Sequence, residues 1–217
     1  MSKHHETTFE CPGCKTEIEI TVWDSLNADL DPEAKDRLLA GGFFSEECPK
    51  CKAVTTISYP MLYHDMTKKV LIQLVFSKKD ADEFKSTISA AADFKAGLPN
   101  VFGEDYLYRI VLSQNDLLEK IHLIDNDLDD RVVEVMKFMI RETARKENPE
   151  MHITKMLFVP DHPQSFVIFT EEQGTLSFDF VMDMYNGIME SHHEIMIERS
   201  KDCWQIDRDW VIGSFSS

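Results

Sequence analysis

Two short stretches, Phe9-Glu10-Cys11-Pro12-Gly13-Cys14 and Cys48-Pro49-Lys50-Cys51, decide how the first part of this chain folds. Each contains a Cys-Pro-x-Cys clip, and together the clips supply four thiolates. A structural zinc ion takes four tetrahedral ligands, and two residues between paired cysteines let both sulfurs face one ion. The sequence therefore predicts a structural Zn²⁺ site with these ligands: Cys11, Cys14, Cys48 and Cys51.

Two other uses of such clips stay open at this stage. Iron can occupy a rubredoxin-like four-thiolate site. Glutaredoxin-like enzymes carry Cys-Pro-x-Cys at the N-terminus of a helix, where the thiol pKa is lowered. Here Cys14 and Cys51 each lead into a segment with the pattern of a strand, which argues against the redox use. A closed four-thiolate site has no open position for catalysis, so the clips alone say little about activity.

The segments around the clips predict a zinc-ribbon-like β region with an inserted helix. Ile18, Ile20 and Val22 alternate with polar residues, which is the period of a half-buried strand. Asp31-Pro32 is typical of a helix start, and Gly41-Gly42 of its end. Further segments are expected in this order: strands at 54–64 and 69–76 joined by the turn Asp65-Met66-Thr67-Lys68, then a helix at 78–96 with Asp80 near its start and Gly97 just past its end.

The remainder predicts helices followed by a smaller α+β unit, so the expected fold class is α+β. Ser113-x-x-Asp116 resembles a capping box before a short helix, and a longer helix begins at Asp129-Asp130 and ends at Pro149. Beyond it we expect strands at 153–159, 165–171, 175–181, 194–199 and 203–206, and a helix at 182–192. The charged tail before Pro149 indicates a boundary, with a zinc-binding domain at 7–148 and a C-terminal α+β region at 150–217.

Composition and charge restrict the classes of function. The chain has 217 residues, of which 43% are hydrophobic and 29% charged, an ordinary composition for a globular protein. Acidic residues outnumber basic ones in each third of the chain, and the formal net charge is −16. A phosphate backbone attracts basic surfaces, so nucleic-acid binding is disfavoured. No stretch of about eighteen apolar residues and no signal-peptide pattern is visible, so we expect a cytoplasmic protein without membrane attachment.

Several longer motifs resemble the CpXC domain family of prokaryotic proteins. The resemblance covers about residues 7–140. It implies a compact zinc-ribbon-like region followed by helices, and it implies no particular activity. The residues that carry it are Phe9–Cys14, Trp23-Asp24-Ser25-Leu26-Asn27, Asp31-Pro32, Tyr59-Pro60-Met61-Leu62-Tyr63-His64-Asp65, Asn115-Asp116-Leu117-Leu118-Glu119-Lys120-Ile121 and Leu128-Asp129-Asp130-Arg131.

Other groups of metal-binding residue types have simpler explanations. Asp125-Asn126-Asp127-Leu128-Asp129 imitates the opening of a calcium loop, but Asp130 and Met136 occupy positions that need Gly and Glu, so helix capping is the expected role. The patch Glu190-Ser191-His192-His193-Glu194 lacks the second histidine of a zinc-protease motif and is expected to be exposed. His4 and His5 are expected in a solvated terminus, and Cys203 in a core.

Tyr63-His64-Asp65 is the most enzyme-like trio. A histidine beside a carboxylate can act as a general base, but neighbouring residues of a strand point to opposite faces. We therefore expect a structural role for His64. The alternative is an enzyme with a cleft near Tyr63 and His64 between the two regions. No phosphate-binding loop or hydrolase nucleophile motif is present in the sequence.

These patterns favour a zinc-binding protein that acts as a protein-interaction or adaptor module, through a protein partner or a homo-oligomer. The eleven methionines agree with this hypothesis, because methionine adapts well at interfaces, although core filling explains most of them. The alternatives are the cleft enzyme and, less favoured, a nucleic-acid-binding zinc ribbon.

Overall fold

The computed structural model describes residues 2–94, 106–172, 174–201 and 203–215. These residues form six helices and ten strands in three sheets, so the α+β prediction is confirmed. The chain divides into two compact units, Met1–Gln114 and Asn115–Ser217. In the described residues, no helix is long and apolar enough to cross a membrane.

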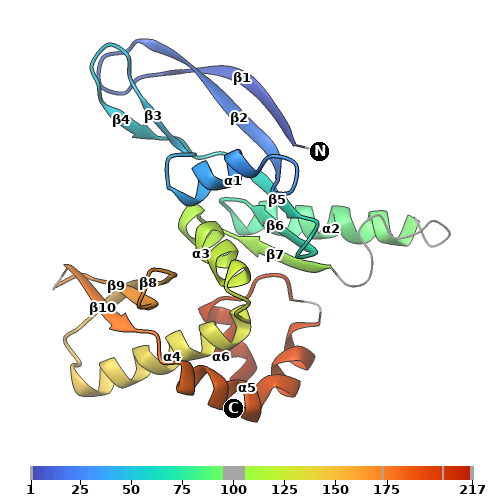
Figure 1. The fold of residues 1–217 in the computed structure, drawn as a ribbon, viewed down its shortest axis with the longest axis vertical. Coiled ribbons are helices and arrows are strands. Elements are labelled where there is room, and N and C mark those ends of the chain that lie inside the picture. Colours follow the sequence, from blue (N-terminus) through green and yellow to red (C-terminus); the bar gives the residue numbers. More distant parts are fainter. Residues whose placement is uncertain (1, 95–105, 173, 202, 216–217) are drawn as a thin grey trace. The chain divides into compact units, whose positions relative to one another are not determined.

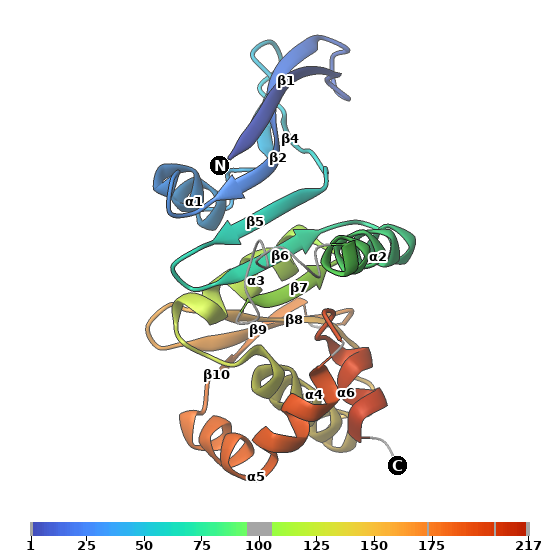
Figure 2. The same ribbon diagram turned by 90° about the vertical axis from the view of Figure 1, so that its right-hand side faces the viewer.

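The first unit is built on a five-stranded sheet with the order β1-β2-β5-β6-β7. Its strands β5, β6 and β7 run side by side (Figure 2). The predicted turn at 65–68 joins β5 to β6 in an antiparallel pair, with Asp65 opposite Val70. The five strands are β1 (Lys3–Glu10), β2 (Glu17–Asn27), β5 (Met61–Asp65), β6 (Val70–Leu74) and β7 (Leu107–Val111).

Two hairpins of this unit carry the cysteine clips. β1 pairs with β2, and β3 (Ser45–Glu47) pairs with β4 (Val54–Thr56), both antiparallel. The turns of the two hairpins lie together at one end of the unit (Figure 1). The strand expected at 54–64 is divided into β4 and β5 with irregular chain between them, because its two halves join different sheets.

Helix α1 (Pro32–Leu39) is the inserted helix, and it begins at Pro32 as predicted. Beyond its C-cap Ala40, Gly41 takes a positive φ of 76° and its amide donates to the Leu38 carbonyl. Helix α2 (Lys78–Phe94) begins with a capping arrangement in which the Ser77 hydroxyl accepts from the Asp80 amide. Its predicted end at Gly97 lies outside the described residues.

The second unit packs helices against a three-stranded antiparallel sheet with the order β10-β9-β8. One core joins α4 to β8, β9 and the two last helices through Met136, Phe158, Phe166, Met196 and Trp210. The first residue of α3, Gln114, still belongs to the first unit. The elements of the second unit are α3 (Gln114–Asp125), α4 (Asp130–Glu147), β8 (Ile153–Val159), β9 (Ser165–Thr170), β10 (Gly174–Asp179), α5 (Met182–Ser200) and α6 (Arg208–Phe215).

Two expected strands at the C-terminal end are wrong. Residues 194–199 continue α5, because Tyr185, Ile188 and Met196 recur at helical spacing and are buried together. The alternating pattern that suggested a strand comes from Ile195 and Ile197, which are exposed on this helix. Residues 203–206 have no regular structure, and α6 was not predicted.

The division into compact units lies at 114/115, not near the charged tail of α4 at 149. That tail is only the exposed end of a helix whose first half is buried. Val132, Val133 and Met136 pack against Phe166 and Met196, which lie beyond 149. That 7–148 and 150–217 form separate domains stays a prediction, which isolated fragments can test.

Candidate metal centre

Each clip forms the turn of one hairpin, and the two turns have the same backbone hydrogen bonds. In the first, Cys11 N donates to Thr16 O and Lys15 N donates to Cys11 O, both at 2.9 Å. In the second, Cys48 N donates to Ala53 O and Lys52 N donates to Cys48 O, also at 2.9 Å. The repeated sequence spacing therefore gives two copies of one knuckle.

The residue after each clip takes a left-handed backbone conformation. Lys15 has φ of 61° and Lys52 has φ of 62°. This conformation costs a non-glycine residue roughly 1–2 kcal/mol. The same conformation at equivalent positions gives the two knuckles the same turn before the strand that follows each clip.

The four sulfurs form a group of the size that a tetrahedral metal ion requires. The Sγ atoms of Cys11 and Cys51 lie 3.7 Å apart, and those of Cys14 and Cys48 lie 3.6 Å apart. All four ligand atoms lie within 4.8 Å of one another. A metal–sulfur distance of about 2.3 Å gives sulfur–sulfur edges of about 3.8 Å in a regular tetrahedron. The four cysteines are therefore close enough together to hold a metal ion.

Burial divides the ligands between the interior and the surface. Cys11 and Cys48 are fully buried and form a small core with Ile18 and Ile20. Cys14 is partly exposed and Cys51 is exposed. This core consists of few side chains besides the cysteines, so the hairpins have little apolar packing of their own at this end.

The pKa values of the cysteine thiols are shifted in opposite directions within the group. Hydrogen bonds from the hydroxyl and the amide of Thr16 lower the pKa of Cys14 to about 6. The amide of Cys51 lowers the pKa of Cys48. The Ala53 amide also acts to lower the pKa of Cys51, but the neighbouring thiols of Cys14 and Cys48 outweigh it and raise this pKa to about 12. Four thiolates repel one another at this distance, and a bound cation offsets this repulsion and stabilises the thiolates.

The surroundings of the clips do not match a thiol oxidoreductase. Each clip is followed by a turn and then by a strand, not by a helix. Sulfurs of different clips lie as close as 3.6 and 3.7 Å, so the two clips form one group and not two separate thiol pairs. A redox Cys-Pro-x-Cys motif instead relies on the N-terminus of a helix to lower a thiol pKa.

A scan against family models matches residues 9–137 to the CpXC protein family, which is more than half of the chain. The chain belongs to the CpXC family. The match includes both clips and ends within the first half of α4, so it covers nearly all of the first compact unit and the beginning of the second in this CpXC protein. No curated protein and no solved structure matches the chain.

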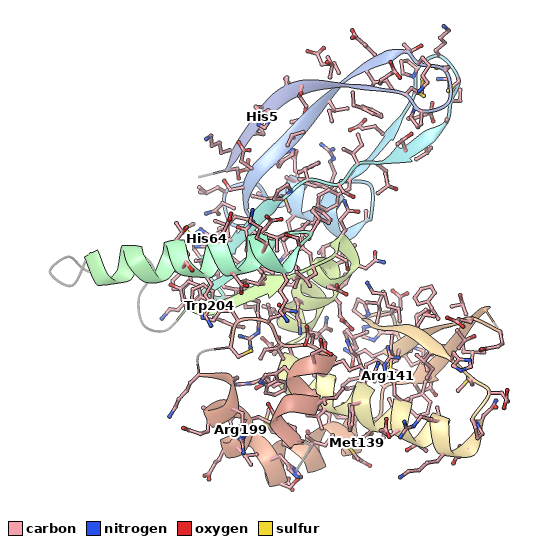
Figure 3. All side chains as sticks on the ribbon, turned by 180° about the vertical axis from the view of Figure 1, so that it is seen from behind. His5, His64, Met139, Arg141, Arg199 and Trp204 are labelled. Atoms are coloured by element: carbon pink, nitrogen blue, oxygen red, sulfur yellow. The ribbon has the colours of Figure 1, made fainter. Side chains whose placement is uncertain are left out.

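The trio Tyr63-His64-Asp65 of the CpXC chain lies on β5, with alternate burial along the strand. Tyr63 and Asp65 share the buried face, where the Tyr63 hydroxyl lies 3.4 Å from the Asp65 carboxylate. His64 lies on the other face, and burial lowers its pKa. Its ring nitrogens lie 3.4 Å from the Asn27 side-chain amide nitrogen and 3.2 Å from the Tyr106 hydroxyl (its position is labelled in Figure 3).

The other groups singled out in the sequence have local structural roles. Asp129 caps α4 by accepting a hydrogen bond from Arg131 N, as expected. His192 is exposed on α5, where its ring lies near Phe215. His4 and His5 are exposed, as expected, and they belong to β1, where His4 packs against Trp23. Cys203 is partly buried and packs against the core of the second unit.

Two features were not found from the sequence. Residues far apart in the sequence, His152 with Glu171 and Glu172, form an exposed group whose ligand atoms lie within 4.8 Å of one another. The bond between His152 Nδ1 and Glu172 explains this group without a metal. The second feature is a buried ionic network in the second unit, made of Glu119, Lys120, Asp130, Glu134 and Lys137.

Proposed function

We propose that the protein is a zinc-stabilised protein-interaction module, in which the four-cysteine centre is a structural Zn²⁺ site. The proposal depends most on the spacing of the four sulfurs, which all lie within 4.8 Å of one another. A tetrahedral ion held by all four thiolates would have no position left for substrate or water. The metal would then act on folding, not on chemistry.

The packing around the centre supports the structural role. Cys11 and Cys48 are buried in the small core between the hairpins, together with Ile18 and Ile20. A metal ion bound there would link the two hairpins in place of a larger apolar core. Structural zinc sites contribute about 10–16 kcal/mol of apparent binding free energy in small zinc-finger peptides, and this binding energy is folding energy. Iron in the same four-thiolate site is the alternative metal.

The interaction role is supported by the character of the surface. The net charge of −16 opposes binding to nucleic acid. Large apolar side chains, including Met139, Phe178 and Met182, are more than two-fifths exposed in the second unit. Met139 and Phe178 line the same hollow, and large contiguous exposed apolar patches mark interaction sites.

The structural role of zinc is tested with single serine substitutions. We expect Cys14→Ser and Cys48→Ser to lower the zinc content well below one ion per chain, and to abolish slow hydrogen exchange in β1–β4. Cys203→Ser is the matched control, because Cys203 lies outside the centre, and it should retain both zinc and protection. Full protection of the hairpins in a metal-free Cys48→Ser protein would refute the structural role of the metal, and full zinc content in that variant would refute the site.

The interaction role needs its own test. A photo-reactive amino acid placed at exposed positions of both units would be used in cells that express the full chain. Any cross-linked protein would then be purified and mixed with zinc-loaded chain. The proposal predicts a stoichiometric complex by size-exclusion chromatography with light scattering. If no cross-linked protein forms a complex after purification, the module hypothesis fails while the metal site stands.

A further inference from the structure

The second unit has two neighbouring apolar hollows along α4. One has a volume of about 410 Å³ and lies between α4 and the sheet, where Ile168, Leu176 and Phe178 line it. The other has a volume of about 460 Å³ and lies between α4, α5 and α6, where Ile188, Val211 and Phe215 line it. Met139 and Met184 line both hollows, so the two form one surface, here called the α4 groove.

The groove follows one face of α4. Val135, Met139, Thr143 and Glu147 line it at four-residue intervals, which places them in one stripe of the helix. Twelve residues of helix rise about 18 Å, so the groove accommodates about three helical turns. Met139 on α4 is 46% exposed and Phe178 on β10 is 42% exposed, so the groove is open to solvent in the chain alone (Met139 is labelled in Figure 3).

The charged side chains among the described residues that line the groove are carboxylates, and Arg141 lies beside the groove, where it donates to the carbonyl of Ile153. Glu147 lines the first hollow and Asp183 lines the second, and among the described lining residues there is no lysine or arginine. The whole chain adds a net charge of −16. An apolar surface with carboxylates in each half and a negative field complements an apolar ligand that carries positive charges at its edges.

We infer that the α4 groove binds a basic amphipathic helix of a partner protein, about three turns long. This inference rests on the proposed function and specifies the partner class for it. The apolar face of such a helix, with anchors at i, i+3, i+4 and i+7, would pack on Met139, Met184 and Phe178. Its lysines or arginines would lie near Glu147 and Asp183. Methionines suit this surface because their unbranched side chains adapt to the shape of the ligand.

A second copy of this chain is a poorer occupant. Two copies would bring two acidic surfaces together, and like charges at an interface oppose association. An anionic membrane surface would be repelled for the same reason.

The test uses the full, zinc-loaded chain and a fluorescent 14-residue peptide of leucine and lysine with the leucines at helical spacing. Two control peptides have the same composition in scrambled order, or glutamate in place of lysine. With ¹³C-methyl-labelled methionine, we expect the peptide to shift the methyl signals of Met139 and Met184, assigned from Met139→Leu and Met184→Leu. We expect both control peptides to bind at least tenfold more weakly.

Substitutions then locate the binding. Met139→Gln should weaken peptide binding at least tenfold, whereas Met66→Gln should not change it. Met66 is a matched control because it is similarly exposed, at 40% against 46% for Met139, and belongs to the first unit. Glu147→Gln combined with Asp183→Asn should weaken binding about three- to tenfold at low salt, with a smaller effect at high salt.

Three results would overturn the inference. They are equal binding of the scrambled or the glutamate peptide, methyl shifts confined to methionines outside the groove, and self-association of the chain alone that Met139→Gln abolishes. Each can occur in a chain that retains zinc and forms the cross-linked complex of the previous section. The failure of this inference is therefore distinguishable from the failure of the proposed function.

Discussion

At the scale of single residues, the buried ionic network is the least expected feature of the molecule. Lys120 Nζ lies 2.9 Å from an Asp130 carboxylate oxygen and donates to the carbonyl of Ile206 at 2.8 Å. Lys137 Nζ bonds both Glu119 and Glu134, at 2.9 and 2.8 Å. Burial acts to lower the pKa of Lys120, but the carboxylates of Asp130 and Glu134 outweigh it and raise this pKa. The network therefore keeps both lysines charged.

Removing one cation from this network should be costly. Lys120→Met leaves the Asp130 and Glu134 carboxylates buried without it, and breaking a buried pair in this way costs about 3–5 kcal/mol. Lys155→Met is the control, because Lys155 pairs with Asp116 near the surface, where a pair contributes about 0–1 kcal/mol. Urea unfolding followed by far-UV circular dichroism measures both. Equal stability of the two variants would contradict the account of the network.

The His152–Glu172 pair predicts a pH dependence. The hydrogen bond that His152 Nδ1 donates to the Glu172 carboxylate raises the pKa of His152 above its ordinary 6.5, and the same bond lowers the pKa of Glu172 below its ordinary 4.5. The histidine contribution to stability is complete below pH 6.5 and is lost as pH rises through the folded-state pKa. The carboxylate contribution is complete above pH 4.5 and is lost as pH falls through its lowered pKa.

NMR titration of the imidazole signals tests this pair directly. His152 should titrate above 6.5 in the native chain and return toward 6.5 in Glu172→Gln. Glu171→Gln is the control and should leave most of the shift in place, because the Glu171 charge is a smaller cause of it. A His152 pKa at or below 6.5 in the native chain would show that the pair does not form.

The sequence identifies a residue's role well where the chemistry of a site requires one residue type. It does so poorly where tertiary packing decides whether a side chain is buried. The four cysteines could be identified from their spacing alone, because two Cys-x-x-Cys clips in one chain are typical of a metal site. Asp130, Glu134 and Lys137 recur at helical spacing, and such a charged stripe normally indicates a solvated face. This stripe is buried because α3, β8 and the carbonyl of Ile206 pack around it, which its spacing does not reveal.

At the scale of elements, the ends of helices and the hairpin turns follow local chemistry. The β5–β6 turn and the start of α1 at Pro32 lie where the sequence predicts them. The end of α5 does not, because the β-branched residues Ile195 and Ile197 favour a strand locally, while burial of Met196 in the core favours the helix. Tertiary packing decides this segment.

The end of α1 gives a prediction with a matched control. Gly41 has φ of 76°, so Gly41→Ala should destabilise the chain by about 1 kcal/mol. Gly42 has no positive φ, and a methyl group there meets no atom within 4 Å. Gly42→Ala should therefore be neutral or slightly stabilising. Thermal unfolding compares the two, and a destabilisation by Gly42→Ala as large as that by Gly41→Ala would refute this account of the helix end.

At the scale of the whole molecule, the family match and the compact units divide the chain differently. The match ends at residue 137, within α4, whereas the units divide at 114/115. All five residues of the ionic network lie within the matched segment, but the carbonyl of Ile206 and the amide of Phe158 that bond the network lie beyond it. Residues beyond the matched segment therefore help to bury the ionic network, which lies within that segment.

Fragments test where the folding boundary lies. We expect residues 115–217 to unfold cooperatively as an isolated fragment, because the core of the second unit lies within it. Residues 150–217 should lack cooperative unfolding, because this fragment loses Val132, Val133 and Met136. Circular dichroism during urea titration distinguishes these cases. Cooperative folding of 150–217 would support the boundary near 149 that the charge pattern indicates.

The central claim is that the two clips hold one structural zinc ion, and native mass spectrometry of the freshly purified, untagged protein tests it most directly. The measurement reports the identity of the metal and the number of ions per chain. The account predicts one zinc ion per chain, lost on acid unfolding and absent from Cys14→Ser. A folded, metal-free chain with four reactive thiols, or a chain that binds iron alone, would contradict it.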